Sequence, residues 1–432
     1  MKYAIVGTGG RHQMYRTAIA ANYGNRHSLV ALCDANAKRA ELSAQWVSDN
    51  TNRQVPTYSD VEFDRMIAEQ KPDVVVVTTP DFTHNKYITA ALRAGCDVMT
   101  EKPMTVNMEK LKEILDVQRE TGRSVTVTFN YRYTPARTQI KDLLMKGTIG
   151  EVTAVDFRWY LDRVHGADYF RRWHRYKEKS GGLLVHKSTH HFDLMNWWLS
   201  STPKRVNAMG RRAFYTPEMA IELGLAGHGP RCHGCPVAEK CDFRLDLDND
   251  AALKALYLDA ESDDGYLRDK CVFADDITIE DTMQVQVEYA NRTTMNYTLQ
   301  AYSPWEGLEI KFRGTKGDIT HRHVEVHGVF GGKRERPDGE AMTTEIHLAG
   351  QEPQQIEVWH GTGDHGGADP VMLGYLFDAD NVEPDRYDRS SNQVMGAWSI
   401  LSGIAANGSL ASGQVVDVDA LLKSYDISLP RH

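Results

Sequence analysis

The first 34 residues constrain this chain more than any other stretch. An apolar strand pattern over residues 2–6 is followed by the turn Gly7-Thr8-Gly9-Gly10, a helical pattern to about residue 22, and a second apolar strand that ends at Asp34. This order is that of a dinucleotide-binding βαβ unit. Glycine is required in the turn because side chains would block the backbone N–H groups that receive a pyrophosphate.

Asp34 indicates which dinucleotide binds. A carboxylate at the end of the second strand accepts both ribose hydroxyls of an adenosine and repels a 2′-phosphate, so we expect NAD rather than NADP. The third glycine of the usual pattern is replaced by His12, and Gly10 adds an extra one. The alternative is a glycine turn that only permits tight packing. The predicted NAD contacts in this stretch are Gly7, Thr8, Gly9, Gly10, Arg11, His12 and Asp34.

Length and charge limit the class of protein. A chain of 432 residues exceeds one hydrophobic core, so we expect two domains. The net charge of -9 argues against nucleic acid as a partner, because phosphate binding requires a positive field. The sequence has neither an 18-residue apolar run nor a secretion signal, which predicts a cytoplasmic protein without a membrane partner.

Alternating strand and helix patterns continue to about residue 130. Apolar strands are expected at 74–77, 97–100 and 124–129, and Ser59 with Glu62 has the spacing of a capping box. Six parallel strands predict a doubly wound α/β domain over 1–130 that binds ligands at the carboxyl ends of its strands. The residues at later strand ends that we expect at the cofactor are Thr79, Pro80, His84, Glu101 and Lys102.

Beyond Arg132 the apolar period changes to two. The alternating segments 283–289, 295–299 and 308–312, with 152–160, predict a mainly antiparallel sheet. Helices near 186–199 and 392–407 would cover one face, giving an α+β domain over 131–432 with an insertion at about 211–275. The open face predicts a homodimer or homotetramer, with solvent exposure as the alternative. Residues 328–339, rich in glycine and charge, predict a mobile surface loop.

Taken together, these motifs resemble the glucose-fructose oxidoreductase, inositol dehydrogenase and MocA family. The resemblance spans most of the chain and rests on the N-terminal glycine turn, Thr79-Pro80 with His84, Glu101-Lys102-Pro103, Asn130-Tyr131-Arg132, Ser180-Gly181-Gly182, His190 with Asp193, and Gly314-Thr315-Lys316-Gly317. It implies a Rossmann domain followed by an α/β domain with a large open sheet. It also implies hydride transfer between a sugar or cyclitol carbon and a nicotinamide.

The resemblance also assigns catalytic roles. Lys102 is similar to the lysine that contacts the nicotinamide ribose and the reacting hydroxyl, and His190 to the histidine that shares its proton. The chain departs from the family pattern at His186, where an aspartate is common, and at Ser188, where a glycine is common. The alternatives are that Lys102 is a surface lysine and that His190 is a hydrogen-bonded structural histidine.

Removing a hydride from a secondary alcohol requires a base for the hydroxyl proton and a cation for the developing alkoxide. Lys102 can supply charge, and His190 can relay a proton near neutral pH. His186 and His190, four residues apart on a helix, also have a zinc spacing, with His191 and Asp193 as further ligands. Because the hydride site is specified elsewhere, we favour His186 as a substrate contact or part of the proton relay.

The segment between Arg158 and Lys179 is rich in aromatic and basic residues. Aromatic faces stack on sugar rings and arginine binds hydroxyls or carboxylates, so this segment suits a carbohydrate. The alternative is a solvated basic loop packed on its own rings, and Asp193 can equally orient a histidine or finish a helical turn. The predicted substrate-binding residues are Tyr131, Arg132, Tyr160, Arg172, Trp173 and Asp193.

Four cysteines fall in the turn-rich insertion at Cys232, Cys235, Cys241 and Cys271. A Cys-x-x-Cys pair in a cytosolic chain favours a metal clip, so a structural zinc is predicted, with a disulfide, free thiols or an iron–sulfur cluster as alternatives.

Three functions are compatible with these features. The first is an NAD-dependent oxidoreductase acting on a sugar, sugar derivative or cyclitol. The second is an NAD-dependent glycosidase that oxidises a ring hydroxyl transiently and then eliminates, as some relatives of this family do. The third is a nucleotide-binding regulator without turnover, which the presence of Lys102 and His190 disfavours.

Overall fold

The computed structural model describes residues 1–330, 332–337, 341–362 and 364–431. The chain forms two compact units. The N-terminal unit holds Met1–Phe129, Asp246–Arg268 and Pro370–Ala397, and the C-terminal unit holds the remainder. The N-terminal unit therefore includes two segments, 246–268 and 370–397, that lie inside the range 131–432 expected for the second domain.

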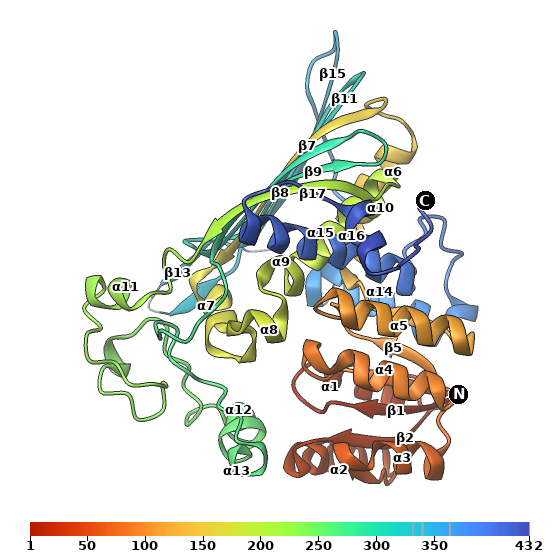
Figure 1. Ribbon diagram of the computed structural model, residues 1–432, viewed down its shortest axis with the longest axis vertical. Helices are drawn as coiled ribbons and strands as arrows, with labels where there is room; N and C mark the ends of the chain where they lie inside the picture. Colours follow the sequence, from red (N-terminus) through yellow and green to blue (C-terminus); the bar gives the residue numbers. More distant parts are fainter. Residues whose placement is uncertain (331, 338–340, 363, 432) are drawn as a thin grey trace. The chain divides into compact units, whose positions relative to one another are not determined.

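The N-terminal unit is built on a six-stranded parallel sheet of order β3-β2-β1-β4-β5-β6, the order of a Rossmann fold. Its helices surround these strands in the red and orange part of Figure 1. The strands are β1 (Lys2–Val6), β2 (Ser28–Asp34), β3 (Thr57–Ser59), β4 (Val74–Val77), β5 (Asp97–Thr100) and β6 (Val125–Val127). The helices are α1 (His12–Thr17, continued by a π-helical turn to Asn22), α2 (Ala37–Thr51), α3 (Phe63–Gln70), α4 (His84–Arg93) and α5 (Met108–Thr121).

Local sequence signals set most of these boundaries. Ser59 and Glu62 form the expected capping box, and the Asn107 side chain accepts a hydrogen bond from the Lys110 N–H at the start of α5. The four valines of β4 are all buried, as expected for a central parallel strand. The sixth strand is shorter than expected, because the chain turns after Val127 into a 3-10 segment that begins at Asn130.

Two later segments complete the N-terminal unit. Residues 246–268 carry the short helices α12 (Ala251–Leu253) and α13 (Glu261–Asp264). From Pro370 on, helix α14 (Asp364–Phe377) places Leu373 and Phe377 in the core beside Tyr3 and Ile5 of β1. The N-terminal core is thus closed by residues from the far end of the chain.

The C-terminal unit is built on a nine-stranded sheet of order β16-β15-β12-β11-β7-β10-β9-β8-β17. Its neighbours are antiparallel except for the parallel pair β7 and β10, so the expected mainly antiparallel sheet is confirmed. The strands are β7 (Val152–Asp162), β8 (Pro203–Arg211), β9 (Thr282–Tyr289), β10 (Thr294–Ser303), β11 (Glu306–Gly314), β12 (Gly317–Val326), β15 (Ala341–Leu348), β16 (Gln354–Ile356) and β17 (Val416–Asp417).

Helices cover one face of this sheet (Figure 1). His191 on α10 hydrogen-bonds the Tyr297 hydroxyl of β10 at 2.6 Å, and the Ser409 hydroxyl on α15 accepts the Ala208 N–H of β8 at 2.9 Å. The helices of this unit are α6 (Pro135–Met145), α7 (Arg163–Arg171), α8 (Lys177–Ser180), α9 (Leu183–His186), α10 (Ser188–Leu199), α11 (Pro217–Glu222), α15 (Gln393–Ser412, from Trp398 on) and α16 (Val418–Ser424).

Helix α15 is the one described helix that is long and apolar enough to cross a membrane, judged by length and composition alone. The structure buries 61% of that stretch, which is also how a core helix of a globular protein behaves.

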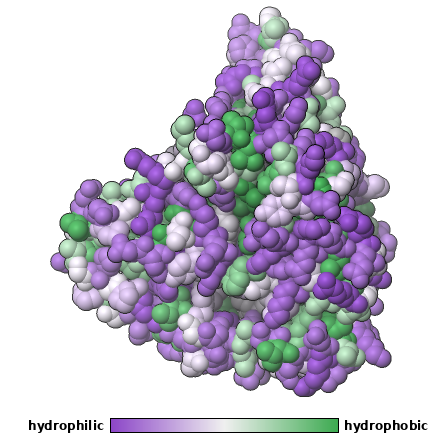
Figure 2. All heavy atoms as spheres, viewed as in Figure 1, coloured by the Kyte–Doolittle hydropathy of each residue, from purple (hydrophilic) through white to green (hydrophobic). Residues whose placement is uncertain are grey.

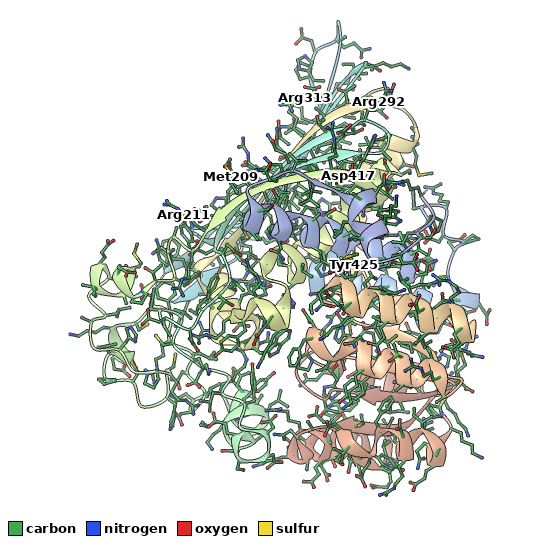
Figure 3. All side chains as sticks on the ribbon, viewed as in Figure 1. Met209, Arg211, Arg292, Arg313, Asp417 and Tyr425 are labelled. Atoms are coloured by element: carbon green, nitrogen blue, oxygen red, sulfur yellow. The ribbon has the colours of Figure 1, made fainter. Side chains whose placement is uncertain are left out.

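The opposite face of the large sheet is polar and partly exposed. Arg313 pairs with Asp156 across β11 and β7, and Glu309 pairs with Arg322 at 3.3 Å. On β8, Met209 is 73% exposed, and it is labelled in Figure 3. Figure 2 shows that hydrophobic atoms gather in groups among hydrophilic ones on the side of the molecule that it draws. Such a face can be solvated, so the sheet does not by itself require an oligomer.

The predicted mobile loop at residues 328–339 is wrong in part. Gly328–Phe330 (β13) and Lys333–Glu335 (β14) pair as an antiparallel two-stranded sheet. Residues 331 and 338–340 lie outside the described residues.

Candidate active site

The glycine turn follows β1 at the carboxyl edge of the parallel sheet. Gly7 has φ +92°, and a Cβ there would lie 2.6 Å from the backbone of Thr78 and Thr79, so only glycine fits. Within the described part of the chain, and apart from its own neighbours, a Cβ on Gly9 would meet no atom within 4 Å. The turn is therefore packed on one side by β4 and open at Gly9, which fits the cradle of a dinucleotide pyrophosphate.

Asp34 lies beside this turn. Its Oδ2 accepts the Thr8 N–H at 2.5 Å and the Thr8 hydroxyl at 2.9 Å, and its Oδ1 accepts the Asn36 N–H at 2.8 Å. Three donors orient the carboxylate and leave lone pairs for ribose hydroxyls. The structure thus brings together Asp34 and the turn, as the sequence predicts.

His12, which replaces the third glycine, is buried. Its Nδ1 lies 2.5 Å from the Gly9 carbonyl and its Nε2 lies 2.7 Å from the Ser43 hydroxyl. A carbonyl can only accept, so Nδ1 carries the proton and Nε2 accepts from Ser43. Burial lowers the pKa of His12 to about 4, so the ring is neutral near pH 7. Its role is to fix the turn from inside rather than to contact a phosphate.

The ends of β4 and β5 are joined by His84. Its Nδ1 lies 2.8 Å from the Pro103 carbonyl and its Nε2 lies 2.9 Å from the Thr79 carbonyl. Burial lowers the pKa of His84. The ring therefore ties Thr79 and Pro80 to the Glu101-Lys102-Pro103 segment, and the predicted cofactor residues share one edge of the sheet.

Glu101 is a buried carboxylate next to Lys102. It accepts hydrogen bonds from Arg11 Nε and the Tyr15 hydroxyl, both at 2.7 Å. Burial opposes its charged form, but the charges of Arg11 and Lys102 outweigh this and lower the pKa of Glu101. The bonds of Glu101 to Arg11 and Tyr15 hold in place the segment that carries Lys102.

In the C-terminal unit, a second group of candidate site residues gathers around Lys187, which follows α9 and is 4% exposed. Its Nζ donates to the Tyr131 hydroxyl at 3.1 Å and lies 5.1 Å from the centre of the Trp159 ring. His190 stacks on Tyr131 with ring centres 4.1 Å apart. Sequence reasoning missed Lys187 and Trp159, although Lys187 stands three residues before His190 and so shares its helical face.

His186 belongs to an aromatic box with Tyr169, Trp173 and His174. His174 stacks on Trp173 at 3.7 Å, and its ring centre lies 4.1 Å from that of His186. Burial raises the pKa of Tyr169 to about 12, an effect that the Lys187 charge opposes. The box therefore lies within electrostatic reach of Lys187.

Glu306 supplies negative charge to the same region. It is 1% exposed, its Oε1 lies 2.7 Å from His165 Nδ1, and its Oε2 lies 3.0 Å from Arg334. Burial opposes ionisation, but the His165, Arg334 and Lys187 charges hold the pKa of Glu306 well below its usual value. Glu306 is a site residue that the sequence pattern did not indicate, because it lies at the start of a strand.

Four of the predicted substrate contacts have partners within the protein itself. Arg132 and Asp193 form a fully buried bidentate pair, with both N–O distances 2.7 Å, so they bind each other. Tyr160 alternates to the open face of β7, opposite to Trp159, and packs on Trp305 at 4.8 Å. Arg172 pairs with Asp168 at 3.3 Å and remains partly exposed.

Comparison with known proteins identifies the family. Residues 1–129 match the oxidoreductase family model with an NAD-binding Rossmann fold, and residues 141–373 match the model of its C-terminal α/β domain. The chain belongs to the glucose-fructose oxidoreductase, inositol dehydrogenase and MocA family. It is an NAD-dependent dehydrogenase-type enzyme, and NAD fits the open glycine turn with Asp34 beside it.

Individual members of this family are similar over different lengths. The oxidoreductase YteT of Bacillus subtilis (strain 168) is 34% identical over 426 residues, which is 96% of each chain. D-glucoside 3-dehydrogenase of Escherichia coli (strain K12) is 28% identical over 52% of this chain and 61% of its own. A structure described as a myo-inositol dehydrogenase from Sinorhizobium meliloti 1021 has a TM-score of 0.59 at 19% identity, covers 97% of this chain and 99% of its own, and shows the shared fold.

The cysteine insertion of this family member carries four thiols around one small cavity, of about 20 Å³. All six cysteines of the chain are free, so the disulfide alternative is wrong. Burial raises the pKa of Cys271 to about 11. Within the described ranges no group of three or more His, Cys, Asp or Glu side chains is arranged to hold a metal ion. Neither the predicted structural zinc at Cys232, Cys235, Cys241 and Cys271 nor a metal at His186 and His190 is therefore supported.

Proposed function

We propose that this enzyme transfers a hydride between NAD and a ring hydroxyl of a sugar, sugar derivative or cyclitol. The observation that carries the proposal is the group around Lys187, whose buried ammonium contacts Tyr131 and Trp159, with His190 stacked on Tyr131. Flat aromatic faces next to hydrogen-bonding groups suit a hydroxylated ring. Two relatives, the D-glucoside 3-dehydrogenase of Escherichia coli and an inositol 2-dehydrogenase of Rhizobium meliloti (strain 1021), support the same substrate class.

In the proposed mechanism, Lys102 steadies the developing alkoxide and His190 accepts the hydroxyl proton. The glycine turn and Asp34 would hold NAD, which would supply the hydride acceptor, so that a secondary alcohol becomes a ketone and its hydroxyl proton passes to His190. Glu101 holds the Lys102 segment in place through Arg11 and Tyr15. Lys187 and Tyr131 orient the substrate hydroxyls, and the stacked Tyr131 ring fixes His190.

A redox-neutral glycosidase is the second candidate. His186 replaces the aspartate common in the family, and it lies in the box with Tyr169, Trp173 and His174, where it could act on a proton next to a transient ketone. Oxidation of a ring hydroxyl would acidify the neighbouring C–H bond, so that the aglycone could be eliminated. Addition of water and return of the hydride from NADH would then restore the hydroxyl, with no net redox change. The first step is the same in both candidates.

The test is a substrate screen with purified protein. Sugars, sugar acids, cyclitols and aryl glycosides are each incubated with NAD, and NADH absorbance and released aglycone are measured in parallel. NADH formed in step with a ketone product supports the dehydrogenase. Aglycone release without net NADH supports the glycosidase, and neither signal with any ring alcohol would contradict both.

We further propose that the enzyme is cytoplasmic and forms a homodimer or homotetramer through the open sheet face. The ion-paired open face of β7 and β11 would then be buried against a second copy. Light scattering of the purified protein measures its oligomeric state directly. A monomer at working concentration would contradict the proposed homodimer or homotetramer.

A further inference from the structure

The segment Asp246–Arg268, here called the arm, is inserted in the second half of the sequence but packs on the N-terminal unit. Its two ends are held at one residue, because the Leu245 N–H donates to Cys232 Sγ at 3.4 Å and the Cys232 N–H donates to the Asp269 carbonyl at 2.8 Å. The arm is therefore a loop whose two ends are held next to each other at Cys232.

The arm contacts the loop directly after Asp34 and the first turn of helix α2. Arg39 Nη1 pairs with Asp264 at 2.5 Å, and its Nε donates to the Leu256 carbonyl at 3.0 Å. Asn36 Nδ2 donates to the Ala260 carbonyl at 2.8 Å. These contacts are buried or partly buried and come from the residues beside the expected ribose site, so the arm is fixed at the adenosine end of the cofactor site.

Tyr257 is the residue of the arm that contacts the glycine turn. The Tyr257 side chain lies over the turn, and its hydroxyl oxygen is 3.4 Å from Gly10 N. The residue is 8% exposed, and the Arg39 guanidinium lies 5.6 Å from its ring centre. Among the described residues other than its chain neighbours, a Cβ built on Gly10 would meet this hydroxyl within 4 Å, at 3.5 Å. The ring is thus positioned by Arg39, with its hydroxyl aimed at the turn.

A tyrosine hydroxyl can accept one hydrogen bond while it donates another. The Tyr257 hydroxyl can accept the Gly10 N–H and still donate its proton to an anionic oxygen. A pyrophosphate received by the glycine turn would meet this hydroxyl within hydrogen-bond reach.

We propose that Tyr257 is an NAD-binding residue that donates to the pyrophosphate, and that the arm covers the adenosine half of the cofactor. This inference rests on NAD binding by the Rossmann unit and not on the identity of the sugar substrate. It makes the arm, a part of the cysteine-containing insertion, a determinant of cofactor affinity and residence time.

The test uses full-length protein, without substrate. Dissociation constants for NAD, ADP and adenosine are measured by calorimetry for wild type, Tyr257→Phe and Tyr257→Ala. Because a hydrogen bond to a charged group is lost, Tyr257→Phe should weaken NAD and ADP by about 10- to 100-fold. Adenosine lacks the pyrophosphate, so its affinity should change less than twofold. Ser262→Ala, at an exposed arm residue that bonds only its neighbour Asp263, is the matched control and should change none of the three.

A second variant tests the contact between the arm and Arg39. Asp264→Asn removes the charge that pairs with Arg39, and stopped-flow fluorescence should show NADH leaving several-fold faster than from wild type. Equal losses for adenosine and ADP in Tyr257→Phe would overturn the pyrophosphate contact and leave only a packing role. NAD affinity within twofold of wild type in a folded Tyr257→Phe would overturn the proposal outright, whereas no NAD binding by wild type would instead refute the cofactor assignment.

Discussion

Asp34 accepts two hydrogen bonds from one residue, Thr8, through both its backbone N–H and its hydroxyl. The glycine turn and the acid at the end of β2 are therefore one rigid element. The carboxylate is oriented before any ribose arrives, which reduces the cost of ordering it on binding.

Asp34→Ala should weaken NAD binding and reduce the preference for NAD over NADP. The substitution removes the acceptor of the ribose hydroxyls and the charge that repels a 2′-phosphate. Dissociation constants of NAD and NADP for wild type and Asp34→Ala measure both effects. Asp49→Ala, at an exposed position on α2, is the control. A wild-type protein that prefers NADP would contradict the account.

Acid should destabilise the N-terminal unit through His12. Its folded pKa of about 4 lies below the unfolded value near 6.5, so the unfolded chain binds the proton more tightly. Stability is then complete above about pH 6.5 and declines as the pH falls toward 4, by at most about 3 kcal/mol at about 1.4 kcal/mol per pH unit.

Thermal melts from pH 7.5 to 4.5 test this effect of His12. The melting temperature of wild type should fall more steeply with acid than that of His12→Asn, which cannot take up the proton. Parallel curves for the two proteins would show that His12 does not contribute.

The buried pair Arg132–Asp193 should be needed for folding stability. Asp193→Ala removes the buried carboxylate that neutralises the Arg132 guanidinium and should cost about 3–5 kcal/mol. Chemical denaturation measures the loss. The double variant Arg132→Met with Asp193→Leu should be less destabilised than the single one, because no buried charge remains. A single variant as stable as wild type would show that the pair is not buried in solution.

Local signals predicted the fold of the first 129 residues well, because capping residues and fully apolar strands act over a few positions. The Asn107 cap and the β4 valines are examples. The arm was not predictable in this way, since its contact between Gly10 and Tyr257 joins residues 247 apart in the chain. Periodicity describes which face of an element is buried but not which distant segment covers it.

The candidate site was predicted in part for similar reasons. The carboxyl ends of the strands in a parallel sheet share one edge, so the sequence alone could group Lys102, Thr79 and Asp34 at one site. Tyr160 lies on the face of β7 opposite to Trp159, and strand alternation alone could have separated the two residues. Lys187 and Glu306 were missed because a buried charge is recognised only from its partners, which lie far apart in the sequence.

Lys187→Met should lower kcat/KM for the true substrate by about 10- to 1,000-fold, because a buried charged donor at the substrate would be lost. NAD affinity should be unchanged, since Lys187 belongs to the C-terminal unit. Steady-state kinetics and calorimetry together test this. Lys204→Met, at an exposed position on β8, is the control, and unchanged kinetics in Lys187→Met would remove it from the site.

The most direct test of the central claim is single-turnover kinetics on the substrate that the screen identifies. Lys102→Ala and His190→Ala should each slow NADH formation by about two to four orders of magnitude, the range for a lost acid or base, with smaller changes in NAD affinity. The double variant should be little slower than either single one if the two residues act as a unit. Near wild-type rates of NADH formation in both single variants would contradict hydride transfer assisted by Lys102 and His190.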